Sequence, residues 1–294
     1  MHYGQASRTA VMVAFWRSLG DFGITTVPGF SDPAARRLLT GPLWRTLLRR
    51  AEGLARDPEN RARAGMTPYI DGIILRVAFI DAVIGASDAR QVVILGAGLD
   101  TRAWRLGALS GARVFEVDHP ATQAYKRERA SLLGPPLAEL RFVPSDFTND
   151  DLERALQSAG YDPNSPTIWV WEGVIMYLDD AALRSTLAAL RRVSAAGSTL
   201  IAHYHEPEAT PTASRLRKLI FSWLGEPQIG LRTQQTMHAE LTRAGFEVVE
   251  DAGIAEQAAK VGSHASANAR LTVSRIVVAR PAAAQTVSPS SPGP

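Results

Sequence analysis

Two glycines and an aspartate have the spacing of a nucleotide-binding site. An apolar run at 92–95 leads into Gly96-Ala97-Gly98, with a helix expected soon after. A buried strand that ends in Gly-x-Gly before a helix presents backbone N–H groups at the strand's carboxyl end. Asp118 ends the next apolar run, 20 residues after Gly98, where a carboxylate can accept both ribose hydroxyls of an adenosine. The pattern predicts a nucleotide-like cofactor, although Asp118 could also cap the helix that follows it.

Thr101 helps to distinguish between two such cofactors. The NAD-binding fingerprint has a third glycine three residues after the second, and Thr101 stands at that position. Without this glycine the helix cannot pack as close to the strand, so a pyrophosphate is less expected at its N-terminus. S-adenosylmethionine contains no phosphate and needs only room for its methionine part. The loop favours S-adenosylmethionine, and an NAD(P)-dependent oxidoreductase stays open as the alternative.

Three polar side chains near the ends of two later apolar runs could act on a substrate. Tyr177 could orient a nucleophile through its hydroxyl, or it could be a core aromatic residue. His203 and His205 lie on one side of their expected strand, because side chains alternate along a strand. Each could be a general base, and each could equally be a hydrogen-bonded residue at a strand end. Since no third ligand accompanies them at a recognisable spacing, we expect no metal site.

The elements that must position these residues alternate between strand and helix. Apolar runs predict strands at 92–96, 113–118, 141–144, 167–172 and 198–204, with helices between them at 101–108, 121–132, 149–158 and 180–194. Such alternation is typical of a parallel sheet with helices on both faces. Residues 1–90 are expected to form a helical extension packed on this core, including helices from 32 to 48 and from 69 to 84.

The C-terminal part departs from this alternation. We expect a helical insertion at 209–232, followed by a helix at 233–244. Strands at 246–251 and 271–279 are then expected to be joined by a loop without a helix, so that the last strand is reversed. The domain that holds the sheet would span 91–280. A tail rich in Pro, Ser and Ala, 281–294, is expected to be disordered.

Composition narrows the class of protein. The 294 residues, 46% of them hydrophobic, suffice for one large α/β domain. No apolar run approaches the roughly 18–20 residues of a membrane span, and the N-terminus lacks a secretory signal pattern. The net charge is +3, but the arginines are spread among acidic residues, so neither nucleic acid nor membrane is an expected partner. The absence of cysteine excludes disulfides and thiolate zinc sites. We expect a cytoplasmic protein.

Several segments, taken in order, resemble the bacterial methyltransferases related to leucine carboxyl methyltransferase. They are LRVAFID (75–81), LGAGLDTRAWRL (95–106), FEVDHP (115–120) with Lys126 following, PSDF (144–147) and WEGVIMYL (171–178). The resemblance covers residues 70 to 205 well. It implies the α/β, Rossmann-like class I methyltransferase fold, with a mostly parallel seven-stranded sheet and a reversed last strand. It also implies S-adenosyl-L-methionine as the methyl donor.

The resemblance further implies which residues hold the methionine part of the donor. Arg76 would pair with its carboxylate, and Glu172 would lie near its amino group, with the 96–98 loop against them. Arg76 could instead pair with Asp81 or Glu52 on a helical surface. Glu172 follows a buried strand, where an unpaired carboxylate would cost several kcal/mol, so it requires a partner.

The adenosine part has its own implied residues. Asp118 would hold the ribose, while Asp146 and the backbone of Phe147 would read the adenine amino group. Asp146 could equally cap the turn that follows it. Tyr177 stands where the family places a tyrosine that faces the acceptor.

One departure from the family bears on the acceptor. Members that act on a protein C-terminus have an arginine soon after the acid of the third strand, and residues 146–149 here contain none. We therefore expect a small-molecule acceptor, methylated on a carboxylate or hydroxyl oxygen. A carboxylate is already ionised, whereas a hydroxyl or amine would gain about 10²–10⁴ in rate from a general base. A non-catalytic protein that binds S-adenosylmethionine is the other alternative.

Overall fold

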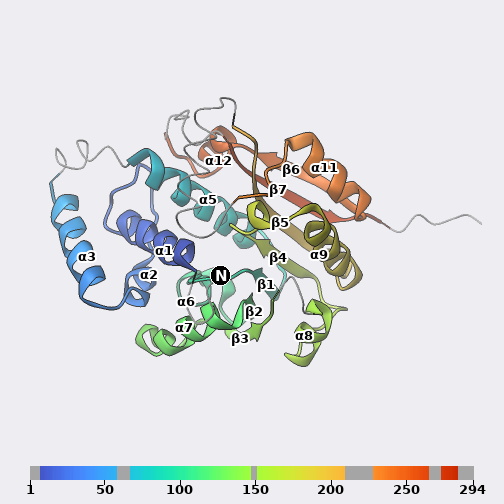
Figure 1. Ribbon diagram of the computed structural model, residues 1–294, viewed down its shortest axis with the longest axis horizontal. Coiled ribbons are helices and arrows are strands. Elements are labelled where there is room, and N and C mark those ends of the chain that lie inside the picture. Colours follow the sequence, from blue (N-terminus) through green and yellow to red (C-terminus); the bar gives the residue numbers. More distant parts are fainter. Residues whose placement is uncertain (1–6, 58–66, 147–150, 209–227, 265–272, 284–294) are drawn as a thin grey trace, which may run out of the picture.

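The computed structural model describes residues 7–57, 67–146, 151–208, 228–264 and 273–283. Within them lies a seven-stranded sheet with the order β3-β2-β1-β4-β5-β7-β6 (Figure 1). Its strands are β1 (Gln91–Leu95), β2 (Arg113–Asp118), β3 (Glu139–Pro144), β4 (Thr167–Trp171), β5 (Thr199–His205), β6 (Phe246–Ala252) and β7 (Ser274–Pro281). β7 pairs antiparallel with β5 and β6, and the other pairings are parallel. The predicted Rossmann-like class I methyltransferase sheet with a reversed last strand is confirmed.

Helices cover both faces of the sheet. They are α1 (Arg8–Asp21), α2 (Pro33–Leu38), α3 (Pro42–Ala55), α5 (Thr67–Gly85), α6 (Arg102–Arg105), α7 (Pro120–Ala130), α8 (Leu152–Ser158), α9 (Asp180–Arg192), α11 (Gln234–Arg243) and α12 (Ile254–Lys260). Figure 1 shows α1, α2 and α3 on one side of the molecule and α8, α9 and α11 on the other. Because the strand side chains alternate, each face of the sheet has its own apolar core.

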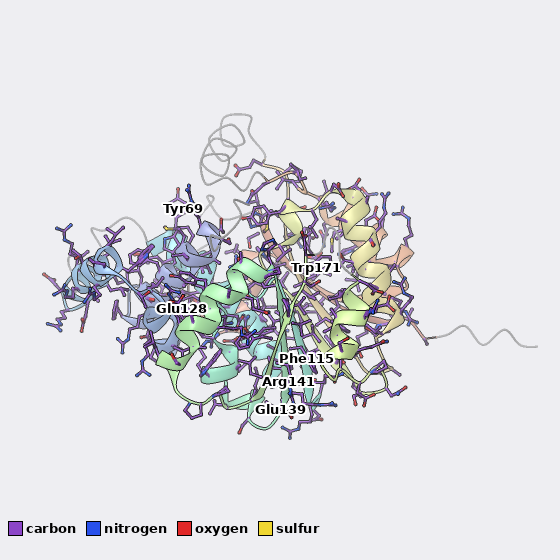
Figure 2. The ribbon with its side chains drawn as sticks, turned by 60° about the horizontal axis from the view of Figure 1, so that its bottom comes forward. Tyr69, Phe115, Glu128, Glu139, Arg141 and Trp171 are labelled. Carbon is purple, nitrogen blue, oxygen red and sulfur yellow. The ribbon has the colours of Figure 1, made fainter. Side chains whose placement is uncertain are left out.

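The two cores differ in the helices that close them. Phe115 and Trp171 belong to the core under α8, α9 and α11, and Figure 2 shows them inside the molecule, with Glu139 and Arg141 at its rim. On the other face, Phe79 of α5 packs against strand residues such as Val92. The last helix of the N-terminal ninety residues therefore shares a core with the sheet.

Two expected elements differ from the structure. The single helix predicted from 32 to 48 is wrong, because the chain breaks at Leu39–Gly41 and forms α2 and α3. Gly41 has a φ of 106°, which ends any helical path there. The helix-free loop predicted between the last two strands is also wrong. It contains α12, whose Ile254 and Ala258 pack against Ile70 and Ile74 of α5.

Other expectations change in extent or lie outside the described residues. The helix predicted at 101–108 is only α6 followed by a 3₁₀ turn, Gly107–Leu109. Of the insertion predicted at 209–232 and the tail predicted at 281–294, residues 209–227 and 284–294 lie outside the part that the structure describes. Among the helices that are described, none has the length and apolar character needed to cross a membrane.

Candidate functional site

The glycine loop after β1 is built on two residues with positive φ. Gly96 has a φ of 64° and Gly98 a φ of 51°, which L side chains rarely adopt. A Cβ on Gly96 would collide with Val174, and one on Gly98 would lie 3.1 Å from the Cβ of Ala10. Between them, the Ala97 N–H donates to Val117 O at 3.1 Å, which ties the loop to β2. The turn thus requires glycine both for its dihedral angles and for the protein packed against it.

Asp118 joins this loop to the end of β2. Its carboxylate accepts a hydrogen bond from Gly98 N and another from His119 N at 2.6 Å. His119, and not Asp118, is the N-cap of α7, because its Nδ1 accepts from Ala121 N. Burial raises the pKa of Asp118, while the two backbone N–H groups oppose the rise. The carboxylate is thus held at the strand end, beside the glycine loop.

The end of β3 lies beside Asp118. Ser145 N donates to Asp118 O at 2.9 Å, which places the half-buried Asp146 one residue further along. Phe147, the other residue implied for the adenine, lies outside the described residues. The sheet therefore brings Asp118 and Asp146 to the same carboxyl edge, as expected of parallel neighbouring strands.

Glu172 finds two protein partners immediately after β4. Arg76 Nε donates to Glu172 Oε1 at 2.7 Å, and Arg102 Nη2 lies 2.9 Å from Glu172 Oε2. Burial would raise the pKa of Glu172, but the charges of Arg102 and Arg76 outweigh it and lower the pKa below its ordinary value. Neither Asp81 nor Glu52 is the partner of Arg76. The partners that Glu172 requires are therefore two arginines of the protein itself.

This pair is part of a larger buried system, here called the arginine–carboxylate network. Arg102 also binds Asp81 at 2.6 Å and Asp100, and Arg105 binds Asp81 at 2.6 Å. The network then continues through Asp32 to Arg17. Its described members are four arginines and four carboxylates, namely Arg17, Arg76, Arg102, Arg105, Asp32, Asp81, Asp100 and Glu172. Equal numbers of opposite charges make it tolerable that these side chains are buried or nearly so.

The three candidates for catalysis occupy different environments. Tyr177 ends the 3₁₀ turn Ile175–Tyr177 and is only half-buried, unlike its neighbours Met176 and Leu178. His203 is completely buried, and both of its ring nitrogens have partners. His205 is half-buried, and its ring centroid lies 4.9 Å from that of His203. Both ring nitrogens of His203 are thus hydrogen-bonded within the protein, and a role as a base stays a prediction.

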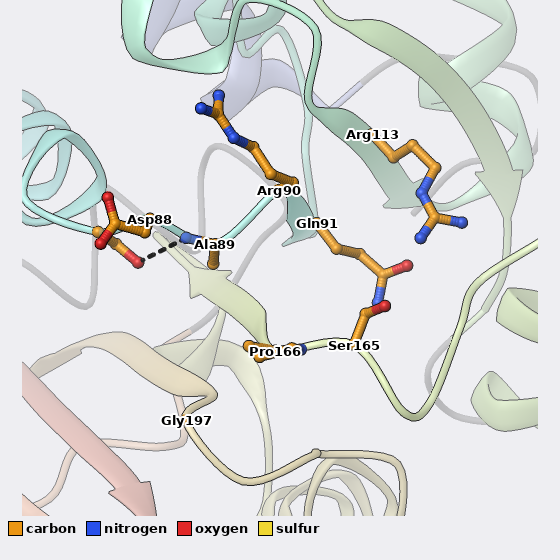
Figure 3. Close-up of a pocket in the computed structure, with 9 residues that line it drawn as sticks. Asp88, Ala89, Arg90, Gln91, Arg113, Ser165, Pro166 and Gly197 are labelled. Atoms are coloured by element: carbon orange, nitrogen blue, oxygen red, sulfur yellow. Dashed lines mark hydrogen bonds between the residues drawn. The ribbon is translucent and has the colours of Figure 1, made fainter.

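Within the described residues, neither a group of metal ligands nor a surface hollow indicates a second functional site. In the described ranges, no three His, Cys, Asp or Glu side chains are grouped closely enough to hold a metal ion. A shallow hollow lies at the opposite edge of the sheet (Figure 3), lined by Ser87, Asp88, Ala89, Arg90, Gln91, Arg113, Ser165, Pro166 and Gly197. Ligands of open α/β sheets bind at the carboxyl ends of the strands, whereas this hollow lies at the amino ends.

Sequence reasoning missed several residues that the structure brings to the site. Arg102 and Asp100 stand inside the quoted LGAGLDTRAWRL segment, so an Asp-x-Arg pair after the glycine loop was an available signal. Val174, against Gly96, and Ser274, against His203, have no local signal, because their partners are distant in the chain.

Comparison with known proteins decides the family. The model of the leucine carboxyl methyltransferase family matches residues 10–191. The chain belongs to this family. A relative from Mycobacteroides abscessus is 36% identical over 227 residues, covering 74% of this chain and 73% of its own length. One from Mycobacterium marinum is 36% identical over 220 residues, covering 74% and 72%. Both carry the name of an S-adenosyl-L-methionine-dependent methyltransferase.

Solved structures share the fold of this leucine carboxyl methyltransferase family member. The crystal structure of a protein from Thermobifida fusca that is named as a methyltransferase aligns with a TM-score of 0.59 at 18% identity. The alignment covers 96% of this chain and 97% of that one. A DUF574 family protein from Streptomyces avermitilis aligns with a TM-score of 0.60 at 16% identity, over 94% and 97%. At these sequence identities the alignments show a shared fold, and this fold agrees with the sheet observed here.

The family also decides between the two cofactors that the glycine loop allowed. The protein is a methyltransferase that uses S-adenosyl-L-methionine, and the oxidoreductase alternative is wrong. The charges at the carboxyl edge fit this donor, whose methionine part carries one ammonium and one carboxylate. Glu172 and Arg76 offer the two complementary charges side by side, and Asp118 offers a hydrogen-bond acceptor for hydroxyls. When bound, the donor supplies an electrophilic methyl group.

Proposed function

We propose that this methyltransferase methylates an oxygen atom, of a carboxylate or a hydroxyl, on a small molecule. The observation that supports the proposal is the geometry of His203, which is buried with both ring nitrogens hydrogen-bonded within the protein, so that we assign it no role as a base. A carboxylate acceptor is already ionised at neutral pH and needs no base, whereas a hydroxyl or an amine must lose a proton and would depend on another group. The absence of an arginine at 146–149 supports a small molecule over a protein C-terminus.

The donor would be held by residues from four strand ends and from helix α5. Arg76 would take the donor carboxylate, and Glu172 the ammonium, while Gly96, Ala97 and Gly98 would form the loop against the methionine part. Asp118 would accept from the ribose hydroxyls, and Asp146 with Phe147 would bind the adenine. The contacts between Arg76 and Glu172 and between Gly98 and Asp118 support these roles, because they place complementary groups at one edge.

Tyr177 would orient the acceptor through its hydroxyl. The turn that carries it is anchored by the buried Arg232, whose Nη2 donates to Leu178 O at 3.1 Å and binds Asp180 at 2.9 Å. Gly230 N donates to Met176 O at 2.9 Å on the same turn. A half-buried tyrosine on a firmly anchored turn is suited to positioning a substrate group. His205, at the end of β5, stays a candidate base for a hydroxyl acceptor.

An acceptor screen tests the proposal. The protein would be incubated with methyl-labelled S-adenosylmethionine and separate panels of small carboxylic acids, phenols, alcohols, amines and peptides with free C-termini. Products would be detected by their mass increase. Mild alkali then releases methanol from a methyl ester but leaves an ether or an N-methyl group intact. We expect label on oxygen only. Label on nitrogen or carbon would contradict the oxygen proposal, and label confined to peptide C-termini would contradict the small-molecule acceptor.

A further inference from the structure

Both ring nitrogens of the buried His203 have a hydrogen-bond partner. Gly173 N donates to His203 Nδ1 at 3.2 Å, and His203 Nε2 lies 3.0 Å from Ser274 Oγ. Because Nδ1 accepts a backbone N–H, the ring proton of the neutral imidazole must be on Nε2, from which it can be donated to Ser274. Burial, together with the charges of Arg76 and His205, lowers the pKa of His203 well below its ordinary value. The ring is therefore a neutral, fixed acceptor toward Gly173.

Gly173 is where the backbone leaves the sheet. The ladder between β4 and β5 ends with the pair Trp171 and Ala202, so the Gly173 N–H has no ladder partner. Leaving this partly buried N–H without an acceptor would carry a desolvation penalty. The side chain of His203, the residue after Ala202 on β5, takes the place of the missing backbone acceptor.

The residues on either side of Gly173 both face the donor site. Glu172 binds Arg76 and Arg102, and Val174 packs against Gly96 of the glycine loop. The bond from Gly173 N to His203 therefore fixes the peptide between Glu172 and Gly173. A rotation of this peptide would move the Glu172 carboxylate away from Arg76.

We propose that His203 is a positioning residue, whose Nδ1 holds the Glu172–Gly173 peptide so that the Glu172 carboxylate can receive the ammonium group of the donor. This inference rests on the proposed contact between Glu172 and that ammonium group. His203 then contributes to donor affinity through Glu172 and takes no part in proton transfer.

Two substitutions test the contributions of the two ring nitrogens of His203 separately. His203→Asn keeps an acceptor at the place of Nδ1 but loses Nε2, whereas His203→Gln keeps a group at the place of Nε2 but loses the acceptor for Gly173 N. Affinities would be measured by calorimetry for S-adenosylhomocysteine and for 5′-methylthioadenosine, which lacks the amino acid group. For S-adenosylhomocysteine we expect roughly 10-fold weaker binding by His203→Gln and a change within about 3-fold for His203→Asn. For 5′-methylthioadenosine we expect both variants to match the wild type.

The two ligands also distinguish a positioning role from general damage. Equal weakening of both ligands by His203→Gln, or stronger weakening by His203→Asn, would overturn the proposal. Glu172→Gln is the matched control for the underlying contact. If Glu172→Gln leaves S-adenosylhomocysteine affinity unchanged, the proposed ammonium contact fails, independently of what His203 does.

A measurement on the wild-type protein covers the case in which His203→Gln does not fold. Nitrogen-15 NMR of the histidine rings reports which nitrogen carries the proton. We expect His203 to be protonated on Nε2 and unprotonated on Nδ1 from about pH 6 to 8. A proton on Nδ1, or a second protonation in this range, would overturn the assignment.

Discussion

Asp118 illustrates how a single carboxylate can shape a loop and still serve a ligand. Two of its lone-pair directions are used by Gly98 N and His119 N, and an ionised carboxylate has about four. The Asp118 carboxylate can therefore accept further hydrogen bonds from the hydroxyls of a ribose. Its sequence position at a strand end was sufficient to select it, but its contact with Gly98 is a property of the fold.

We expect Asp118→Ala to weaken binding of S-adenosylhomocysteine roughly 10-fold or more, because a hydrogen bond to a charged group contributes about 1.5–3 kcal/mol. Calorimetric titration measures this directly. Asp118→Asn, which keeps one neutral acceptor, should fall between the wild type and Asp118→Ala. Unchanged affinity in Asp118→Ala would remove this residue from the ribose site.

Asp100 should make the protein sensitive to acid. Burial raises the pKa of Asp100, but Arg102, Lys126 and Arg17 together lower it from 3.8 to about 2. Since the folded-state pKa lies below the unfolded value, the carboxylate stabilises the fold above about pH 4, and this contribution is lost as the pH falls from 4 to 2. The total is about 2 kcal/mol, at 1.36 kcal/mol per unit.

Denaturant unfolding of the wild type and Asp100→Asn between pH 5 and 3 tests this expectation. The free energy of unfolding of the wild type should fall by about 1 kcal/mol more than that of Asp100→Asn over this range. Parallel pH dependences in the two proteins would show that Asp100 has an ordinary pKa.

Among the elements, the glycine loop and α12 differ in how far the sequence predicts them. The loop was predictable, since a buried strand followed by Gly-x-Gly is a local pattern. α12 was not, because its seven residues, Ile254–Lys260, carry too short a pattern to indicate a helix. Packing of Ile254 and Ala258 against α5 stabilises it, and that contact spans most of the chain.

Gly96 and Gly111 have similar φ values but different surroundings, so replacing each by alanine separates the effect of backbone strain from that of packing. Gly96 has a φ of 64° and faces Val174, while Gly111 has a φ of 71° and meets no described atom within 4 Å of an added Cβ. Gly111→Ala should lower the free energy of unfolding by about 1–2 kcal/mol, the cost of the left-handed backbone. Gly96→Ala should lower it further and weaken S-adenosylhomocysteine binding, because Val174 must also move. Equal losses in the two variants would contradict the role of Val174.

At the scale of the whole molecule, the arginine–carboxylate network joins the N-terminal helices to the sheet. Asp32 caps α2 through Ala35 N and also binds Thr101 of the loop region at 2.8 Å. Arg17 of α1 lies 3.2 Å from Asp32, and Arg105 of α6 lies 3.4 Å from it. A fully buried carboxylate thus connects helices α1 and α2 to the segment that carries the glycine loop.

We expect Asp32→Asn to lower the free energy of unfolding by about 3 kcal/mol, because removal of one partner leaves buried arginine charge uncompensated. The exposed Asp88 provides a matched control, and Asp88→Asn should change stability by less than about 0.5 kcal/mol. Chemical denaturation of both variants makes the comparison. A loss in Asp32→Asn as small as that in Asp88→Asn would show that the network contributes little to stability.

The amino-acid sequence by itself determined the features that depend on neighbouring residues. The glycine loop, the alternation of strands and helices and the family motifs follow from patterns within short segments. The reversed last strand was also predicted, but from a helix-free loop that the structure replaces with α12. Only the tertiary structure decided which charges pair and which nitrogens are free. Arg76 meets Glu172 across 96 residues, and His203 meets Ser274 across 71. Such partners are chosen by how the strand ends align in the sheet, which short-range sequence patterns do not specify.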